Sequence, residues 1–344
     1  MTTLPTTPAS AAAGTSPLFV STTTLHSILT HKTLITHLQS TLPTASISIS
    51  TPPRHSHSTS QNSSLLLMPS FSSSPSIPYT GVKLVTSHPQ NSSLNLPSIH
   101  ACYALFSSIT GQTLALFDAT DLTLYRTSSV SALASSYLSN PNSEILVMVG
   151  SGNLSPHLIT AHLSIRPSIK RVIIWNRTHD RAAELAARLR VKKEPIFDGV
   201  SFEHCGCLDD VIGLGDIVSC ATNSERPLVK GEMLKKGAHL DLVGSFKPSM
   251  MECDDEALRR GRVVVDNEVA MEEAGELVGA FERGVIARDD ICGDLVELIK
   301  GEKVGRKTES EITVFKSVGS GVVDLLTAQS VYETLKKDQQ SEQH

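Results

Sequence analysis

A glycine-rich turn at residues 150–155 is the segment whose residue types point most directly to chemistry. It reads GSGNLS and follows the apolar run Ile145–Val149. Gly150 permits a tight turn, and Gly152 lets backbone N–H groups approach a pyrophosphate at the N-terminus of the next helix. Ser155 replaces the usual third glycine and is small enough for close helix–strand packing. We therefore expect a dinucleotide to bind at Gly150, Ser151, Gly152, Asn153 and Leu154, although such a turn taken alone is also an ordinary strand–helix connection.

The residues after the next predicted strand, Arg171–Trp175, bear on the choice of cofactor. They are Asn176, Arg177 and Thr178. A site for NAD would place Asp or Glu here to bind the ribose 2′-OH, whereas a guanidinium pairs with a 2′-phosphate. We expect these three residues to bind NADPH, with NADH bound more weakly. The alternative is that Arg177 is a surface residue at a strand end.

Two cations, Arg54 and Lys83, lie in a region without acidic residues. The first acidic residue of the chain is Asp118, and the only lysines and arginines before it are Lys32, Arg54 and Lys83. Lys83 lies within a β-prone run, and a buried cation is costly without an anionic partner. A substrate carboxylate would be that partner, so we interpret Lys83 as part of a substrate site.

The elements that must position these residues change character near residue 127. Before it, short β-prone runs separated by Pro, Ser, Asn and Gly turns predict an antiparallel sheet. A helix is expected ahead of this sheet over Leu18–Leu42, and the serine-rich stretch Ser60–Ser76 is interpreted as a loop around the first strand. The predicted strands are Ser64–Met68, Gly81–Thr86, His100–Ser107 and Thr113–Phe117.

From residue 127 onward, strands and helices alternate with the spacing of βαβ units, which predicts a parallel sheet and an α/β fold with a Rossmann dinucleotide-binding domain. Further strands of this sheet are predicted over Asp216–Ala221, His239–Val243 and Arg262–Asp266, whereas Ile312–Phe315 is assigned to a tail that follows this half of the chain. Helices are predicted over Thr127–Tyr137, Asp180–Leu189, Met271–Leu277, Asp290–Ile299 and Gly321–Leu335.

Length and composition exclude several classes of protein. A chain of 344 residues favours two domains, and no stretch approaches the roughly 18 apolar residues that span a bilayer. The net charge of −5, without a basic face, gives no reason to expect a nucleic-acid partner. The six cysteines have no disulfide spacing and are expected to be reduced thiols. His204–Cys207 lacks a second ligand pair at zinc spacing, so no metal is expected.

The first part of the chain is poor in acids and rich in Ser and Thr, which is typical of a plastid transit peptide. Only residues 1–16 look like a flexible extension, which is short for such a peptide. A plastid location is our expectation, and the cytoplasm is the alternative.

Several segments together give the chain a resemblance to a known family. They are LLLMP (65–69), GVKLVTSHPQN (81–91), LYRTSSVSA (124–132), WNRT (175–178) and ITVFKSVGSGVVD (312–324). With these segments the chain resembles the ornithine cyclodeaminase/μ-crystallin family over about residues 18–335. LDLVGSF and AFERGVI are most similar to plant reductases of this family that convert Δ1-piperideine-2-carboxylate to pipecolate, in a lysine-derived pathway linked to plant immunity.

The resemblance implies an arrangement of domains and roles for residues. A substrate-binding and dimerisation α+β domain would comprise residues 17–125 and 315–344, a Rossmann domain residues 126–314, and two subunits would form a homodimer. Arg54 and Arg126 would bind a substrate carboxylate. Lys83 would be the active-site lysine, which either binds that carboxylate or donates a proton. Beside the nicotinamide we expect Lys316, Ser317 and Gly319, with Ala221 and Thr222 as further cofactor contacts.

Phe246 departs from the cyclodeaminase pattern. Cyclodeaminases carry an aspartate two residues beyond a Val-Gly pair, and this chain has Phe246 there, after Val243-Gly244-Ser245. Phe cannot exchange the protons that deamination and ring closure require, whereas reduction of a cyclic imine needs one hydride and one proton. Asp241 lies nearby but within the predicted strand. The sequence thus favours an NADPH-dependent reductase of a small cyclic imino acid, the ring size being open. The alternatives are an ornithine cyclodeaminase, and a non-catalytic μ-crystallin-like protein that binds NADPH or a small ligand.

Overall fold

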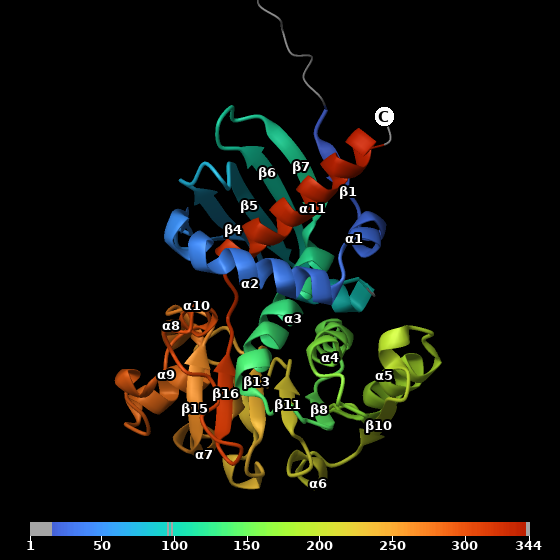
Figure 1. Cartoon of the computed structure of the whole chain (residues 1–344), viewed down its shortest axis with the longest axis vertical. Helices are drawn as coiled ribbons and strands as arrows, with labels where there is room; N and C mark the ends of the chain where they lie inside the picture. Colours follow the sequence, from blue (N-terminus) through green and yellow to red (C-terminus); the bar gives the residue numbers. More distant parts are fainter. Residues whose placement is uncertain (1–15, 95, 98, 342–344) are drawn as a thin grey trace, which may run out of the picture.

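The computed structural model describes residues 16–94, 96–97 and 99–341. Nearly all of the predicted N-terminal extension, residues 1–16, therefore lies outside the described residues. Two sheets form separate layers, joined by the helix α3 (Ala119–Leu138), as Figure 1 shows. We call the upper part the sheet domain and the lower part the dinucleotide domain. The α/β fold class predicted from the sequence is confirmed.

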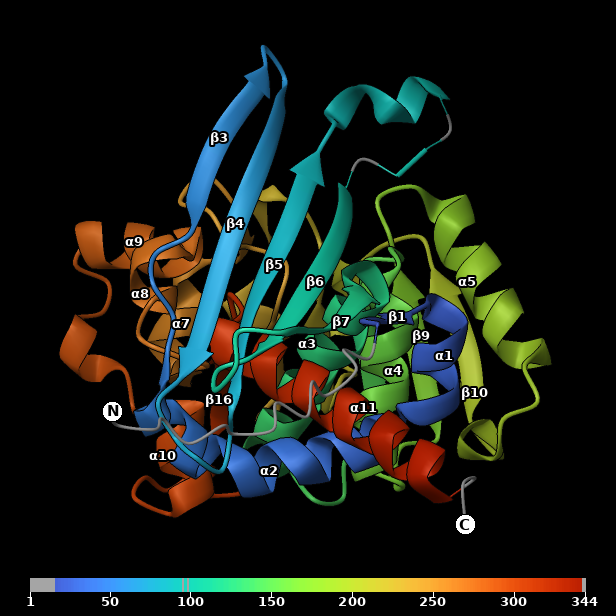
Figure 2. The same ribbon diagram turned by 90° about the horizontal axis from the view of Figure 1, so that it is seen from above.

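The sheet domain contains seven strands in the order β1-β7-β6-β5-β4-β2, with β3 paired to β4. All of these pairs are antiparallel except β1 with β7. The helix α11 crosses one face of the sheet beside α2 (Figure 2). The bounds are β1 Leu18–Val20, α1 Thr22–Ile28, α2 His31–Ser48, β2 Ile49–Ser50, β3 His55–Ser60, β4 Ser63–Ser72, β5 Tyr79–Ser87, β6 Ile99–Ser107, β7 Thr113–Asp118 and α11 Gly321–Ser341.

The dinucleotide domain is built on seven parallel strands in the order β10-β9-β8-β11-β13-β16-β15. Its strands are β8 Ile145–Val149, β9 Arg171–Trp175, β10 Ser201–Cys205, β11 Ile217–Cys220, β13 His239–Leu242, β15 Gly261–Val265 and β16 Ile312–Lys316, and a separate pair is β12 Glu225–Val229 with β14 Met251–Cys253. The helices are α4 Leu154–Ile165, α5 His179–Val191, α6 Asp209–Ile212, α7 Asp255–Arg260, α8 Ala270–Glu273, α9 Gly275–Glu282 and α10 Leu295–Lys300.

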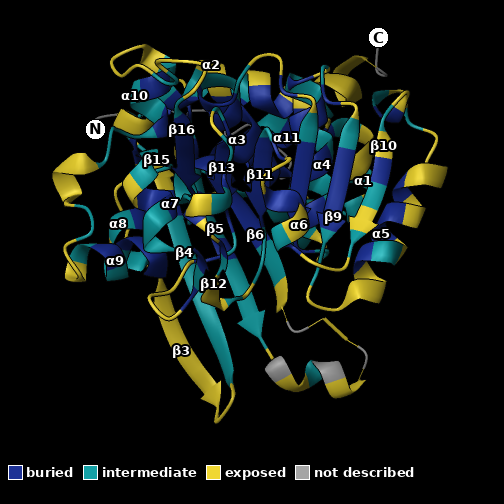
Figure 3. Cartoon of the chain, turned by 90° about the horizontal axis from the view of Figure 1, so that it is seen from below, coloured by how far each residue is buried: buried dark blue, intermediate teal, exposed yellow. Residues whose placement is uncertain are grey.

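Alternation along β8 explains why this sheet is buried on both faces. Leu146 and Met148 pack with α4 and α5, while Val147 and Val149 pack with α6, α7 and α9. Figure 3 shows the central strands β11, β13 and β16 of this sheet buried, in contrast to the exposed β3. The order of strands reverses between β8 and β11, and such a switch point is where open α/β sheets bind ligands.

Several predicted elements differ from the structure for local reasons. The helix expected over Leu18–Leu42 is a short strand and two helices, because the Thr30 side chain accepts a hydrogen bond from the Thr33 N–H (3.1 Å) and begins a new helix. The serine-rich stretch from residue 60 is mostly β4 and not a loop. The helix expected over Asp290–Ile299 begins only at Leu295, because Asp294 is its N-cap.

The two predicted domain boundaries fall inside elements of the structure. Residue 126 lies inside α3, which begins at Ala119. Residue 314 lies inside β16, which extends to Lys316. The strand β10 and the hairpin strand β3 were not predicted from the sequence. In the described part of the chain, no helix is long and apolar enough to cross a membrane.

Candidate active site

The glycine-rich turn forms a cradle at the C-terminal end of β8. Gly150 has φ = +115°, and a Cβ atom there would lie 2.6 Å from the Ala221 carbonyl oxygen. This position therefore requires glycine, and the turn packs against the end of β11. A Cβ at Gly152 would meet no atom within 4 Å, so the space beside the N-terminus of α4 is open.

Two serines of the same turn carry buried hydroxyl groups without hydrogen-bond partners in the described residues. They are Ser151 and Ser155. The N-cap of α4, Asn153, makes no side-chain capping bond, so the first N–H groups of the helix are not satisfied by that side chain. Donors that lack protein partners at an open helix N-terminus fit the pyrophosphate of a dinucleotide.

The three residues predicted to select the cofactor follow β9 at the same edge of the sheet. Arg177 and Thr178 are exposed, and Arg177 forms no ion pair with other described residues. The Asn176 side-chain amide donates to the Thr178 carbonyl (2.9 Å), which fixes the start of α5. The guanidinium is thus free to contact a phosphate group at this edge.

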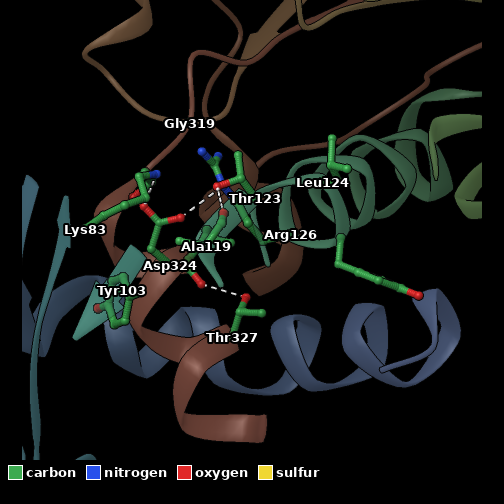
Figure 4. Close-up of polar contacts among 12 residues, drawn as sticks. Lys83, Tyr103, Ala119, Thr123, Leu124, Arg126, Gly319, Asp324 and Thr327 are labelled. Atoms are coloured by element: carbon green, nitrogen blue, oxygen red, sulfur yellow. Dashed lines mark hydrogen bonds and ion pairs between the residues drawn. The ribbon is translucent and has the colours of Figure 1, made fainter. Parts of the chain in front are cut away.

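Lys83, Arg126 and Asp324 form a buried charge cluster between the two domains (Figure 4). Lys83 Nζ lies 2.6 Å from Asp324 Oδ2, and Arg126 Nε lies 3.0 Å from Asp324 Oδ1. The exposed fractions of these residues are 5%, 8% and 3%. Two cations and one carboxylate leave a net charge of +2 − 1 = +1 in a place that water barely reaches. A buried excess charge of this kind favours binding of an anion.

The pKa values in this cluster are displaced from their ordinary values. Burial lowers the pKa of Lys83; the neighbouring carboxylate of Asp324 opposes this effect and Arg126 adds to it. For Asp324, burial alone would raise the pKa, but Lys83 and Arg126 hold it below its usual range. Asp324 therefore stays ionised, and Lys83 releases a proton more readily than a solvated lysine.

Asp324 was missed as a site residue in the sequence, although it is the anionic partner that Lys83 requires. The sequence analysis assigns that part to a substrate carboxylate, whereas in the structure the carboxylate of Asp324 fills it, 2.6 Å from Nζ. Asp324 lies in the first turn of α11. It is also the last residue of the segment 312–324 that carries the family resemblance. An acid in that segment, set against the acid-free region around Lys83, was the available signal.

Arg54 lies apart from this cluster in the segment between β2 and β3. Its guanidinium forms an ion pair with Glu273 at the end of α8 in the dinucleotide domain. It is close enough to Lys83 to lower the pKa of that lysine through its charge. The structure thus places Arg54 at the domain junction, with its charge already partnered.

Lys316 points into the dinucleotide domain. Its side chain is fully buried, with Nζ 2.6 Å from Ser245 Oγ and 3.0 Å from Glu276 Oε1. Both partners are residues that the sequence analysis does not assign to the cofactor site. Lys316 instead anchors Ser245, in the loop after β13.

Glu252 holds the ends of β11 and β13 together. Its carboxylate accepts bonds from the Thr222 N–H (2.7 Å), the Thr222 hydroxyl (2.8 Å) and the Gly244 N–H (2.7 Å). Thr222 was predicted as a cofactor contact, and its hydroxyl is occupied by Glu252. Ala221 faces Gly150 through its carbonyl oxygen. Both residues therefore shape the rim of the dinucleotide site through their backbone.

Phe246 lies in a loop and is partly exposed, whereas Asp241 lies within a strand and is buried. Phe246 is 39% exposed in the loop after β13. Asp241 is fully buried within β13 and accepts bonds from Ser219 (2.7 Å) and Ser131 (2.9 Å). No group of three or more His, Cys, Asp or Glu side chains in the described residues is arranged to hold a metal ion.

Comparison with known proteins agrees with this architecture. Protein SAR DEFICIENT 4 of Arabidopsis thaliana is 63% identical over 318 residues, which cover 92% of this chain and 97% of the relative. A Delta(1)-pyrroline-2-carboxylate reductase of Colwellia psychrerythraea is 36% identical over 257 residues, which cover 74% of this chain and 80% of the relative.

A solved structure extends the similarity to three dimensions. It is that of the Thermococcus litoralis Delta(1)-pyrroline-2-carboxylate reductase in complex with NADH and L-proline. It has a TM-score of 0.85 at 28% identity and covers 93% of this chain and 98% of that chain. The model of the ornithine cyclodeaminase/mu-crystallin family matches residues 17–339, which include the dinucleotide turn and the charge cluster. The resemblance inferred from the sequence is thereby confirmed: this chain belongs to the ornithine cyclodeaminase/mu-crystallin family.

Proposed function

We propose that the protein reduces a cyclic ketimine carboxylate with a nicotinamide dinucleotide, and that its substrate is Δ1-piperideine-2-carboxylate, which it converts to pipecolate. The observation that carries the proposal is the buried cluster of Lys83, Arg126 and Asp324, with its one excess positive charge. The cluster lies at the domain junction, on the side of the parallel sheet where the glycine-rich turn ends β8. An anionic substrate and a dinucleotide would meet there. Relatives that reduce Delta(1)-pyrroline-2-carboxylate support the same chemistry.

The protein's own residues position the substrate and move one proton. Arg126 binds the carboxylate through the guanidinium nitrogens that Asp324 leaves free, and Arg54 adds a second contact when it leaves Glu273. These contacts with the carboxylate hold the C=N carbon of the substrate beside the nicotinamide, which supplies the hydride. Such orientation accounts for much of the catalysis.

Lys83 is the proton donor in this proposal. The ring nitrogen must gain one proton while the adjacent carbon gains hydride, which gives the saturated cyclic amine. Burial lowers the pKa of Lys83, so its ammonium group gives up a proton more easily. Asp324 holds the Nζ atom at 2.6 Å and fixes its direction. The sequence leaves open whether Lys83 binds the carboxylate or donates the proton, and we propose proton donation.

NADPH is the proposed cofactor in preference to NADH. The support is Arg177, an exposed guanidinium without an ion-pair partner among the described residues, at the strand end where a 2′-phosphate would lie. No carboxylate follows β9 at Asn176 or Thr178 to bind a free 2′-OH. The Thermococcus relative was solved with NADH, so the preference is proposed for this chain on its own residues.

We also propose a homodimer formed through the outer face of the antiparallel sheet. Phe19 on β1 and Leu116 on β7 are opposite each other in register, and they are 74% and 40% exposed. Their neighbours Ala115 and Phe117 point to the opposite face and are fully buried. Sedimentation velocity would show a dimer for the parent protein and a monomer for Phe19→Asp/Leu116→Glu. A parent protein that sediments as a monomer would contradict the proposal.

Import into plastids is a further proposal, supported by the acid-poor, Ser- and Thr-rich start of the chain. A fluorescent fusion to the C-terminus of the full chain should collect in plastids of plant cells. A fusion that lacks residues 1–16 should stay in the cytoplasm. Uniform cytoplasmic fluorescence of both fusions would contradict it.

The experiment that tests the proposed reaction is a panel of cyclic ketimines. Purified protein is mixed with NADPH and five-membered, six-membered or sulfur-containing ketimine carboxylates, and cofactor oxidation is followed by absorbance. The six-membered carboxylate should give the highest kcat/KM and a product identified as pipecolate. Absence of NADPH oxidation with every member of the panel would reject the function.

A further inference from the structure

The loop between β16 and α11 is held in place by a single carboxylate of the dinucleotide domain. Asp266, just after β15, accepts three hydrogen bonds on one oxygen, Oδ2. The donors are the Ser317 hydroxyl (2.8 Å), the Val318 N–H (3.0 Å) and the Gly319 N–H (2.8 Å). Asn267 adds a bond to the Gly319 carbonyl (3.3 Å). Two consecutive backbone N–H groups directed at one charged oxygen fix the loop's conformation strongly.

Gly319 lies directly against the guanidinium of Arg126 (Figure 4). It has φ = +89°, and a Cβ atom at this position would lie 2.6 Å from Arg126 Nη1 and 3.1 Å from Nη2. The flat guanidinium therefore occupies the space that any side chain at 319 would fill. Asp324 fixes the Nε edge of the same group at 3.0 Å. Arg126 is thus constrained on one edge by an ion pair and beside it by the loop backbone.

We propose that Asp266 and Gly319 are positioning residues that set the direction of the Arg126 guanidinium, and so the orientation of the substrate carboxylate toward the nicotinamide. The proposal rests on the function proposed above. Asp266 follows a strand of the sheet that carries the dinucleotide turn, whereas Arg126 lies in α3 at the domain junction. The loop at 317–319 connects the two, because Asp266 binds its backbone and Gly319 packs against the arginine. Neither Asp266 nor Gly319 needs to touch the substrate.

The test compares two variants with matched controls. Asp266→Asn keeps the shape of the side chain but weakens the bonds to the loop, and Gly319→Ala inserts a methyl group where the guanidinium lies. Asp254→Asn is the control for the first, because Asp254 also accepts backbone N–H bonds, at Ala257 (3.0 Å) and Gly231 (2.8 Å). Gly301→Ala is the control for the second, because Gly301 has φ = +73° but open space around its Cα.

The readout separates positioning from general structural damage. Each variant is assayed with Δ1-piperideine-2-carboxylate and with Δ1-piperideine, which lacks the carboxylate, and NADPH affinity is measured by fluorescence. Both test variants should lose at least tenfold in kcat/KM on the carboxylate substrate, less than threefold on Δ1-piperideine, and little NADPH affinity. The control variants should have the same kcat/KM as the parent protein on both substrates. Equal losses on both substrates, or a matching loss of NADPH affinity, would overturn the proposal.

A binding measurement keeps this inference distinct from the proposed reaction. Picolinate, a flat six-membered ring with one carboxylate, is titrated into the NADPH-loaded protein by calorimetry. Asp266→Asn and Gly319→Ala should weaken picolinate at least fivefold, while the two controls bind it as the parent does. A parent that binds picolinate but reduces no ketimine would reject the reaction alone. Unchanged picolinate affinity in both test variants would reject the positioning role.

Discussion

Arg54 and Glu273 form an ion pair between the two domains, although 219 residues separate them in the sequence. Arg54 comes from the β2–β3 segment of the sheet domain and Glu273 from the end of α8. The carboxylate of Glu273 thus pairs with Arg54, which the sequence analysis assigns to binding a substrate carboxylate. Both side chains are partly exposed, at 34% and 27%, so the pair is screened and weak enough to exchange.

Substitution of Glu273 tests this exchange. Glu273→Gln should lower KM for the ketimine carboxylate about two- to fivefold, because a partly exposed ion pair contributes roughly 0.2–1 kcal/mol. The value of kcat should stay nearly constant. Steady-state kinetics with saturating NADPH measure both quantities, and Glu272→Gln, on the exposed side of the same helix, is the control. A rise in KM would mean that Glu273 orients Arg54 for binding.

Removal of the charge on Asp324 should damage both stability and activity. Asp324→Asn leaves Lys83 and Arg126 buried without an anion, and loss of one partner of a buried ion pair costs about 3–5 kcal/mol. We expect a free energy of unfolding in urea lower by that amount and a kcat/KM reduced at least a hundredfold. Asp338→Asn, exposed on the same helix, should change neither. Full stability of Asp324→Asn would contradict the view that this carboxylate compensates the two buried cations.

Arg177 is expected to decide between the two cofactors. One charge-assisted contact contributes roughly 1.5–3 kcal/mol, so Arg177→Ala should weaken NADPH about tenfold or more and leave NADH nearly unchanged. Fluorescence titrations measure both affinities, with Arg188→Ala, exposed on the last turn of α5, as control. Equal losses for both cofactors would identify Arg177 as structural.

Two histidines, one buried and one half-buried, predict loss of stability in acid. His31 stacks on Tyr125 and lies beside His157, and burial lowers the pKa of His31 to about 3 and that of His157 to about 4. A pKa lower in the folded than in the unfolded state means that stability is complete above pH 6.5 and falls as pH drops toward these values.

His31 alone should cost about 2 kcal/mol between pH 7 and pH 5. His31→Phe keeps the stacking on Tyr125 and should flatten the fall in Tm by thermal denaturation over this range. His57→Gln, on the exposed strand β3, should leave the pH dependence as it is. An unchanged slope in His31→Phe would place the acid sensitivity elsewhere.

Phe246 separates reductase from cyclodeaminase. With NAD and L-ornithine the protein should release no ammonia and form no proline, since Phe246 cannot move protons. Phe246→Leu should retain most of the ketimine reductase activity, and Phe246→Asp should impair it, because a carboxylate beside bound substrate and cofactor is costly to desolvate. Ammonia release at a rate similar to imine reduction would overturn the assignment. A drop in Tm for both variants, without a difference in activity, would make Phe246 a packing residue.

Local patterns predicted most strands of the parallel sheet, because these strands are short apolar runs bounded by turns, whereas the edge strand β10 is mostly polar and was not predicted. Ile145–Val149 and Arg171–Trp175 have the predicted bounds. The region Leu18–Leu42 was predicted less well. Its apolar residues suit one long helix, but the Ser21 and Thr30 side chains cap two separate helices there, after a short strand.

The ion pairs of the candidate site were also beyond what local sequence patterns predict. The sequence singled out Lys83 and Arg126, but their shared partner is 241 residues from Lys83, and no local spacing connects the two. Lys316 was placed beside the cofactor because of its segment, yet its side chain turns inward to Glu276. The backbone position of a segment can be inferred from a motif, whereas the direction of each side chain depends on contacts made elsewhere in the fold.

The chain passes between the domains twice, once through α3 and once from β16 into α11, and each crossing carries one member of the Arg126–Asp324 ion pair. The dinucleotide domain is therefore an insertion into the sheet domain, and each of its two junctions carries one residue of this ion pair. A substitution at either residue would act on the charge cluster and on the connection between the two domains at once.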